Sequence, residues 1–304
     1  MTYTSNKPAQ SPGQTRGQSA GQTRLSLEAI KAHKNKPQPL VCLTAYTAPM
    51  AAILDPHCDL LLVGDSMGMV LYGMDNTLGV TLDMMIAHTK AVMRGAPSAF
   101  ILADMPYGTY EDSPAQALAN AKRLMEETGC GAVKLEGDGT MAATVETLVA
   151  AGIPVMAHIG LRPQMVVQEG GYKIKGKTPE QAEALLQDAL TLEKAGAFAI
   201  LIEGTIELVA RSITQALRVP TIGIGASVAC DGQILVTDDM IGLLESNPPK
   251  FAKQYGAVRK TIGAMIEEYA RDVRERIFPD AAHVYTAPKE NAPKENAASL
   301  KKAS

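Results

Sequence analysis

Ionisable side chains close five short apolar runs of this sequence. The runs are LLLVGDS (60–66), AFILADMP (99–106), GAVKLEG (131–137), VMAHIG (155–160) and AFAILIEG (197–204). The side chains at or near their carboxyl ends are Asp65, Asp104, Lys134, Glu136, His158 and Glu203. A charge inside a dry strand is costly, so several charges at matching strand ends predict a shared polar pocket.

Asp65 and Asp104 form the pair with the clearest chemistry. Hard divalent cations such as Mg²⁺ prefer oxygen ligands and often use one or two carboxylates, with water and substrate as the remaining ligands. Glu136 could supply a further oxygen. No His or Cys cluster has zinc-like spacing. The alternative is that the two Asp residues cap the helices or turns that follow.

Four of these residues could be catalytic or could have only a structural role, namely Lys134, Glu136, His158 and Glu203. Lys134 and Glu136 share one strand face, where the lysine could bind a carboxylate or stabilise an enolate, or the two could form only a mutual ion pair. His158 could act directly or be a hydrogen-bonded polar residue. Glu203 suits a general base, or the cap of a helix that begins near residue 205.

Two further segments could contribute to a ligand pocket. The loop EGGYKIKG (169–176) is rich in Gly and Lys, and could be a lid, contact an anionic group, or be only a flexible connection. Met69 and Met74 could line the pocket, although methionines are often core filler.

The elements that must position these residues alternate between strand and helix. Besides the five runs, 39–46, 220–226 and 234–236 read as strands. Helical patterns cover 26–35, 47–55, 81–94, 113–128, 141–151, 178–195 and 205–217, with start signals at Ser113 and Thr178. This alternation indicates a parallel sheet. Polar residues at five successive strand ends favour a closed (β/α)₈ barrel over a doubly wound sheet, and Gly223-Ile-Gly225 is only a fragment of a dinucleotide fingerprint.

Length and composition set the domain plan and exclude several classes. The 304 residues carry a net charge of −3, with 46% hydrophobic residues and 4% aromatics without Trp, which disfavours nucleic-acid and anionic-membrane surfaces. Four scattered cysteines suggest reduced thiols in the cytoplasm. We expect disordered tails at 1–24 and 283–304 around one catalytic barrel at 25–282.

Several long motifs resemble the ketopantoate hydroxymethyltransferase (3-methyl-2-oxobutanoate hydroxymethyltransferase) family over about residues 25–265. They are VGDSMGMVLYG (63–73), HTKAVMRGAP (88–97), ADMPYGTY (103–110), VKLEG (133–137), HIGLRPQ (158–164), GGYKIKG (170–176), LIEG (201–204) and DGQILV (231–236). The resemblance implies a (β/α)₈ TIM barrel of the phosphoenolpyruvate/pyruvate-binding group. It also implies hydroxymethyl transfer from 5,10-methylenetetrahydrofolate to 3-methyl-2-oxobutanoate, giving 2-dehydropantoate for pantothenate synthesis.

The family pattern also implies residue roles, a cofactor and an assembly. Asp65 and Asp104 match the residues that bind Mg²⁺, one ion per subunit, and Glu136 belongs to the same metal site. Ser66 and Lys134, together with Asp65 and Asp104, match the ketoacid site. Glu203 matches the catalytic base, with His158 as a possible auxiliary group. The family forms homo-oligomers, commonly decamers.

One departure and two competing functions remain at this point. Ser227 follows Gly225-Ala226 where the family often has a glycine, which could alter a loop or the approach of folate. A related barrel lyase acting on a 2-oxo acid would use similar enolate chemistry, but the Cys-Gly-His loop of the isocitrate-lyase branch is absent from the sequence. A non-catalytic ligand-binding barrel predicts loss of part of the charged set, and all six charged positions are present.

Overall fold

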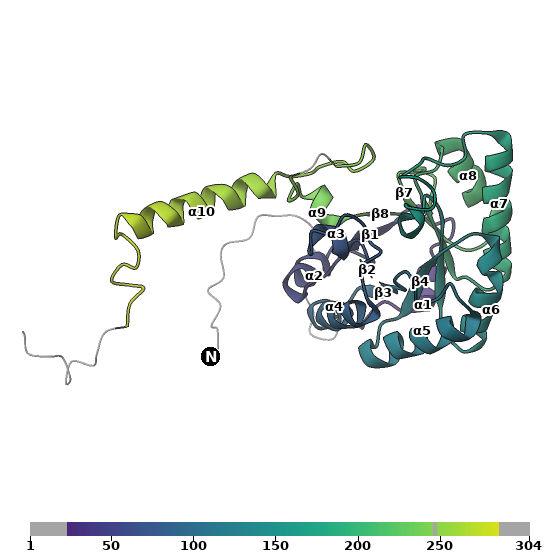
Figure 1. Cartoon of the computed structure of the whole chain (residues 1–304), viewed down its shortest axis with the longest axis horizontal. Coiled ribbons are helices and arrows are strands. Elements are labelled where there is room, and N and C mark those ends of the chain that lie inside the picture. Colours follow the sequence, from purple (N-terminus) through teal and green to yellow (C-terminus); the bar gives the residue numbers. More distant parts are fainter. Residues whose placement is uncertain (1–22, 246–247, 286–304) are drawn as a thin grey trace, which may run out of the picture. The chain divides into compact units, whose positions relative to one another are not determined.

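The computed structural model of the protein describes residues 23–245 and 248–285. The chain divides into two compact units, Met1–Gly256 and Ala257–Ser304 (Figure 1). Most of each expected tail lies outside the described residues. Arg24, the last residue of the expected amino-terminal tail, donates a hydrogen bond of 2.9 Å to the carbonyl of Ala99.

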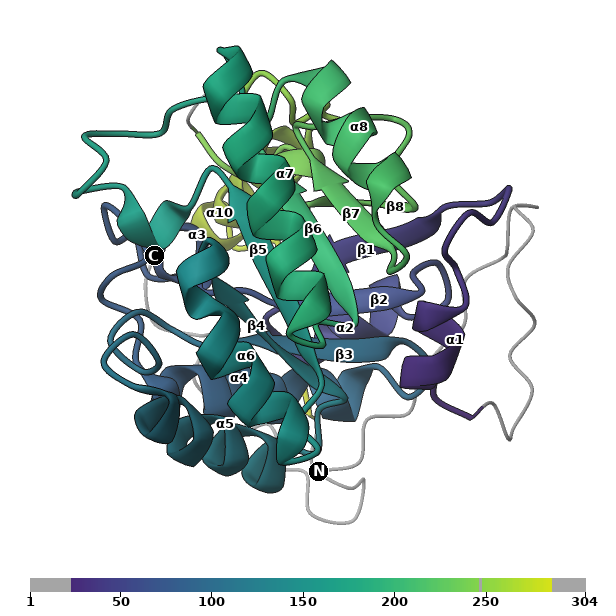
Figure 2. The ribbon, with the colours of Figure 1, turned by 90° about the vertical axis from the view of Figure 1, so that its right-hand side faces the viewer.

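Eight parallel strands in the described part of the first unit close into a barrel in chain order, and β8 pairs with β1 (Figure 2). Their bounds are β1 Leu40–Thr44, β2 Leu60–Val63, β3 Phe100–Asp104, β4 Ala132–Glu136, β5 Val155–Gly160, β6 Ala199–Glu203, β7 Thr221–Ile224 and β8 Gly232–Leu235. The expected (β/α)₈ barrel is therefore confirmed. The last strand begins at Gly232 rather than at residue 234, because a glycine carries no apolar signal.

Helices form the outer layer of the barrel, as Figure 2 shows for α5 to α8. The expected helical segments correspond to α1 Leu27–Lys31, α2 Ala48–Leu54, α4 Leu82–Gly95, α5 Pro114–Thr128, α6 Ala142–Ala150, α7 Pro179–Lys194 and α8 Glu207–Ala216. Both predicted start signals are helix caps. The side chain of Ser113 accepts from the backbone N–H of Gln116, and that of Thr178 accepts from the backbone N–H of Gln181. The short helices α3 Met67–Val70 and α9 Thr237–Met240 were not expected.

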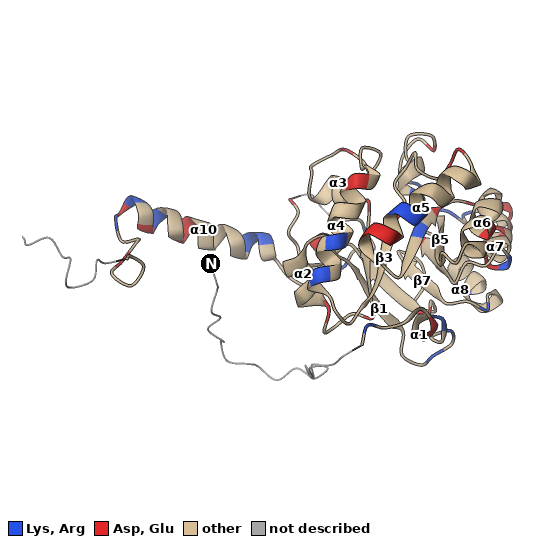
Figure 3. Ribbon diagram, turned by 90° about the horizontal axis from the view of Figure 1, so that it is seen from below, with Lys and Arg blue, Asp and Glu red and all other residues tan. Residues whose placement is uncertain are grey.

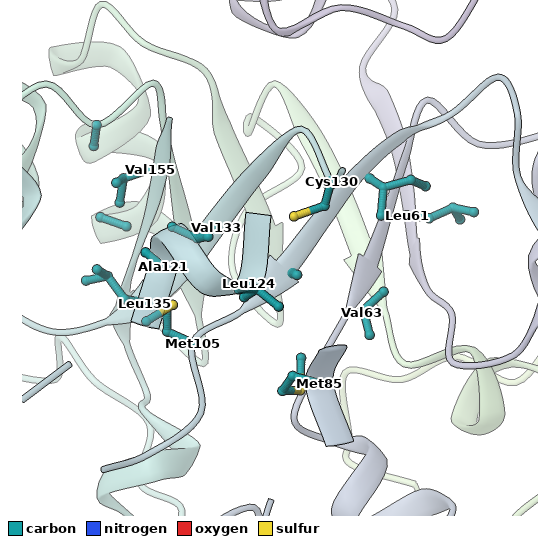
Figure 4. Packing of buried hydrophobic residues seen from close by; sticks show 14 of the residues in the cluster. Leu61, Val63, Met85, Met105, Ala121, Leu124, Cys130, Val133, Leu135 and Val155 are labelled. Carbon is teal, nitrogen blue, oxygen red and sulfur yellow. The ribbon is translucent and has the colours of Figure 1, made fainter. Parts of the chain in front are cut away.

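Two apolar layers hold the barrel together, one on each face of the sheet. Side chains on the outer face pack against the helices, and Figure 4 shows Leu61, Val63, Val133, Leu135 and Val155 among them. The alternate residues face the lumen, where a second cluster contains Leu40, Leu60, Leu62, Phe100, Leu102, Ala132, Met156, Ala199 and Leu201. This period of two, typical of strands, determines which side of the sheet each strand-end charge faces.

The second unit contains α10, Val258–Arg274, which the sequence reasoning did not anticipate. None of its residues is buried. Ile262, Met265, Ile266, Tyr269 and Val273 recur at helical spacing and are all exposed, so α10 has an apolar face. Charged residues occupy other parts of α10, as Figure 3 shows. No helix in the described ranges is long and apolar enough to cross a membrane.

Candidate active site

Strand parity and barrel closure bring the predicted residues to one rim of the lumen. Lys134 and Glu136 follow the lumen-facing Ala132 at steps of two, while Val133 and Leu135 face the helices. Neighbouring strands are in register, so that Asp104 lies beside Lys134 and Glu136 beside His158. The carboxyl ends of the strands therefore form a continuous polar rim.

This rim lines a cavity of about 730 Å³. All seven predicted site residues contribute to its wall, namely Asp65, Ser66, Asp104, Lys134, Glu136, His158 and Glu203. Apolar side chains complete the wall, including Leu62, Met69, Met74, Leu201, Ile224 and Phe251. A wall that combines charged groups with apolar surface suits a small anionic substrate together with a larger organic one.

Asp65 and Asp104 are linked directly. The backbone N–H of Asp65 donates to Asp104 Oδ2 at 3.0 Å. Gly64 leaves room for the Ser66 hydroxyl beside this pair, because a Cβ at that position would lie 2.8 Å from Ser66 Oγ. Burial raises the pKa of both carboxyl groups, and repulsion from Asp104 and Glu136 helps to bring the pKa of Asp65 to about 8.

Lys134 is the buried cation beside these carboxylates. Its Nζ lies 2.7 Å from Asp104 Oδ1, and both side chains are almost fully buried. Burial alone would lower the pKa of Lys134, but Asp104, Glu136 and Asp65 outweigh burial and raise it. The ammonium is therefore charged at neutral pH and offers a fixed positive charge to an anionic ligand.

His158 lies between two carboxylates. Its Nδ1 is 3.5 Å from Glu136 Oε1, and its Nε2 is 3.4 Å from Glu203 Oε2. Burial and the Lys134 ammonium oppose protonation of His158, but Glu136 and Glu203 outweigh them and raise its pKa to about 8. The imidazole therefore connects the predicted base with the centre of the rim.

Tyr46 and Ser66 meet at the side of the cavity where β1 and β2 end. The two hydroxyl groups are 2.8 Å apart, and Tyr46 is buried. Burial raises the pKa of Tyr46, so its hydroxyl remains protonated. No role was predicted for Tyr46, although it is the last residue of the expected first strand, 39–46.

Gln164 and Tyr110 are buried behind the cavity wall, and no role was predicted for either. The amide nitrogen of Gln164 donates to Asp65 Oδ2 at 2.8 Å, and its backbone N–H donates to Glu136 Oε2 at 3.0 Å. Tyr110 donates to the side-chain oxygen of Gln164. The one signal in the sequence was the position of Gln164 six residues after His158, at the end of HIGLRPQ.

The Gly- and Lys-rich loop lies at the mouth of the cavity through Tyr172. Ion pairs hold its base, because Arg162 contacts Asp138 and Glu169, each at 2.9 Å, and Lys175 contacts Glu169. Positive φ angles at 170, 171 and 176 explain the glycines there. Glu169 and Lys175 are therefore paired within the protein, Lys173 donates to the backbone carbonyl of Glu169, and none of the three lines the cavity.

Ser227 lies away from the ligand-binding surface. Its hydroxyl donates to Glu207 Oε1 at 2.7 Å and accepts from the amide of Ala229 at 3.1 Å. It is not among the residues that line the cavity. The replacement of the family glycine therefore stabilises a turn next to α8 and leaves the cavity wall unchanged.

The buried carboxylates of the rim offer oxygen ligands to a divalent cation. In the described part of the chain, no three His, Cys, Asp or Glu side chains are arranged to hold a metal ion by themselves. Asp104 Oδ1 is nonetheless a buried oxygen without a hydrogen-bond partner, despite its closeness to Lys134. Two neighbouring carboxyl groups with raised pKa gain from a nearby cation, so Asp65 and Asp104 fit a Mg²⁺ that takes its other ligands from water and substrate.

Solved structures with the same architecture define the class of this protein. Phosphonopyruvate hydrolase in complex with oxalate and Mg²⁺ aligns with a TM-score of 0.55 at 14% identity, over 86% of this chain and 93% of the hydrolase. The second, 2,3-dimethylmalate lyase, aligns with a TM-score of 0.55 at 18% identity, over 86% and 89%, and is described as a PEP mutase/isocitrate lyase superfamily member. The chain therefore has the (β/α)₈ barrel fold of that superfamily.

Sequence comparison identifies the particular family. The profile of the ketopantoate hydroxymethyltransferase family matches residues 24–281. A 3-methyl-2-oxobutanoate hydroxymethyltransferase of Mesorhizobium japonicum is 58% identical over 88% of this chain and 93% of the relative. One of Phenylobacterium zucineum is 56% identical over 87% and 95%. The chain belongs to the ketopantoate hydroxymethyltransferase family.

Proposed function

We propose that this chain is a 3-methyl-2-oxobutanoate hydroxymethyltransferase. It transfers a one-carbon unit from 5,10-methylenetetrahydrofolate to 3-methyl-2-oxobutanoate, and water completes the hydroxymethyl group of 2-dehydropantoate, an intermediate for pantothenate synthesis. The observation that carries this proposal is that seven side chains matching the family pattern line one cavity of a chain that belongs to the family.

Asp65 and Asp104 are the proposed Mg²⁺ ligands, and Glu136 adds negative charge to the same metal site. Glu136 already accepts from the backbone N–H of Gln164 and lies beside His158, so it would act on the metal through its charge. When bound, the metal supplies Lewis-acid polarisation of the ketoacid. Ser66 and Lys134 hold the ketoacid beside Asp65 and Asp104, and the Lys134 ammonium opposes the negative charge of the substrate carboxylate.

Glu203 is the proposed general base. It takes the proton from C3 of the ketoacid, and Lys134 stabilises the negative charge that develops on the keto oxygen. C3 then forms a bond to the methylene carbon of the folate as the first of the two bonds between this carbon and the folate nitrogens breaks, and the released nitrogen takes up the proton removed from C3. The second C–N bond breaks as water supplies the hydroxyl group to the carbon and a proton to the other nitrogen. His158 contacts Glu203 at 3.4 Å and assists by holding this carboxylate toward the lumen.

A homo-oligomer, with a decamer as the specific expectation, is the proposed assembly. The exposed apolar face of α10 supports it, because large apolar side chains at helical spacing are a usual feature of subunit contacts. A cytoplasmic location is proposed because Cys42, Cys58, Cys130 and Cys230 are all buried free thiols.

The test is product formation by the purified protein. With both substrates and Mg²⁺, we expect 2-dehydropantoate and tetrahydrofolate, loss of product with a chelator, and recovery when excess Mg²⁺ is added. Absence of product with Mg²⁺ present would contradict the proposal. Cleavage of 2,3-dimethylmalate instead would favour the lyase alternative, which the names of the relatives do not support.

A further inference from the structure

The side chain of Gln164 makes hydrogen bonds to Asp65, Met105 and Tyr110 behind the rim. It is 1% exposed and follows β5 in the short turn Pro163–Met165. Its amide nitrogen donates to Asp65 Oδ2 at 2.8 Å and to the carbonyl of Met105 at 2.9 Å. Its amide oxygen accepts from the Tyr110 hydroxyl. Both N–H donors of the side-chain amide are therefore engaged in hydrogen bonds, and its oxygen accepts a third.

The neighbours of Gln164 allow only one orientation of its amide. The carbonyl of Met105 can only accept, so the nitrogen must face it. The Tyr110 hydroxyl already accepts from the backbone N–H of Glu136 at 3.2 Å, so its proton points to the Gln164 oxygen. A flipped amide would place two acceptors against each other on the side of Met105 and Asp65.

This orientation connects the ends of three neighbouring strands. Asp65 follows β2, Met105 follows β3 and Glu136 ends β4, and Gln164 bonds to all three. One oxygen of Asp65 is therefore held by the Gln164 amide, while the other oxygen, Oδ1, has no such constraint from Gln164. Loss of a side chain that orients a metal-binding carboxylate typically weakens metal affinity by about 10–100-fold.

We propose that Gln164 is a positioning residue that holds Asp65 in the orientation needed to bind Mg²⁺, with Tyr110 fixing the amide of Gln164. This inference rests on the proposed function, because it assigns Asp65 to the metal. Gln164 itself contacts neither the metal nor the ketoacid in this account. It restricts the side chain of Asp65 to few orientations before the cation binds, so that Asp65 loses less conformational freedom on binding.

The first test is Gln164→Met, which keeps the approximate length of the side chain and removes both polar ends. Isothermal titration of Mg²⁺ into the protein without substrate should show affinity about 10–100-fold weaker than in the wild type. The matched control is Gln168→Met in the same segment, since Gln168 is exposed and bonds only to the Tyr107 hydroxyl. This control should bind Mg²⁺ as the wild type does.

A second variant keeps the inference testable if Gln164→Met does not fold. Tyr110→Phe removes only the hydroxyl that orients the amide, and should weaken Mg²⁺ binding in the same direction but by a smaller factor. Combining Tyr110→Phe with Gln164→Met should add little to the single Gln164 variant, because both act through the same carboxylate. Circular dichroism and thermal melting show which variants are folded.

The outcomes separate this inference from the proposed function. If the wild type binds Mg²⁺ and the folded variants bind it with the same affinity, the role of Gln164 is overturned and the proposed function stands. A wild type that binds no Mg²⁺ would contradict both. Weaker binding in Gln164→Met and Tyr110→Phe, with normal binding in Gln168→Met, supports the assignment.

Discussion

The barrel lumen has a lower half, near the amino ends of the strands, and an upper half, at their carboxyl ends. The same strand faces build both halves, yet the two halves differ completely in chemistry. The lower half is apolar, with Leu60, Phe100, Ala132 and Met156 in one cluster. A few residues further along the same strands, the rim carries carboxylates, an ammonium and an imidazole. The difference shows that the period of two selects the face, whereas the position along the strand decides between packing and catalysis.

The two halves also differ in how they contribute to stability. Apolar side chains in the lower half stabilise the fold because their surface is buried away from water. Charges above are buried at a cost that their mutual pairing offsets only in part, as the raised pKa of Asp65 shows. The rim therefore carries unfavourable electrostatics that a bound cation and anionic substrate would relieve.

The largest expected effect comes from removing the cation of the rim. Lys134→Met leaves Asp104 and Glu136 without their ammonium, which should lower the free energy of unfolding by about 3–5 kcal/mol at pH 8. Urea unfolding measures it. Lys90→Met is the control, because its ion pair with Glu127 at 2.8 Å is exposed and should change stability by at most ~1 kcal/mol. Equal effects in the two variants would remove the distinction between rim and surface.

The apolar half should respond through stability alone. Leu102→Ala removes a fully buried lumen side chain that does not line the cavity. We expect the free energy of unfolding to fall by about 2–5 kcal/mol, with kcat retained in the folded protein. Denaturant unfolding and steady-state kinetics below the melting temperature check this. A large loss of kcat with little loss of stability would contradict the division of the lumen.

His158 should give the metal-free protein a defined pH dependence. Its pKa of about 8 in the folded state lies above the ordinary value of 6.5 for histidine, so protonation stabilises the folded state. This contribution, about 2 kcal/mol, is fully present below pH ~6.5 and is lost as the pH rises through ~8. The measurement is urea unfolding between pH 6 and 9. Asp65, whose pKa of about 8 lies above its ordinary value, adds a slope of the same sign. His158→Gln should therefore reduce the slope by the contribution of His158, and an unchanged slope in that variant would assign it to Asp65 or another group.

Ser227→Gly should have the smallest effect. It deletes the hydrogen bond from Ser227 to Glu207, for an expected loss of about 1 kcal/mol, and restores the glycine common in the family. Because Ser227 does not line the cavity, the KM for folate should not change. A shift in this KM would show that the turn reaches the folate after all.

Most of the barrel could be predicted from the sequence because its signals are local. Apolar runs bounded by Gly or Pro marked the strands, and caps such as Ser113 marked the helices. Period two put Lys134 and Glu136 on one face, but strand parity alone did not say whether that face was the lumen. Closure of the barrel, with Asp104 beside Lys134 and Glu136 beside His158, settled this.

The polar contacts at the centre of the site could not be predicted in the same way. Gln164 bonds to Asp65 across 99 positions of sequence, and Tyr110 to Gln164 across 54. No local pattern encodes such pairs, because they exist only once the barrel has closed. The helix α10 is a different case, since the spacing of its apolar residues is a local pattern of the sequence.

The central claim is that the rim performs proton abstraction with Glu203 as the base. The direct measurement is exchange of the C3 proton of 3-methyl-2-oxobutanoate in D₂O, followed by NMR with Mg²⁺ and without folate. The account predicts exchange by the wild type and a loss of about 10²–10⁴ in rate for Glu203→Gln. Wild-type exchange by folded Glu203→Gln would contradict it.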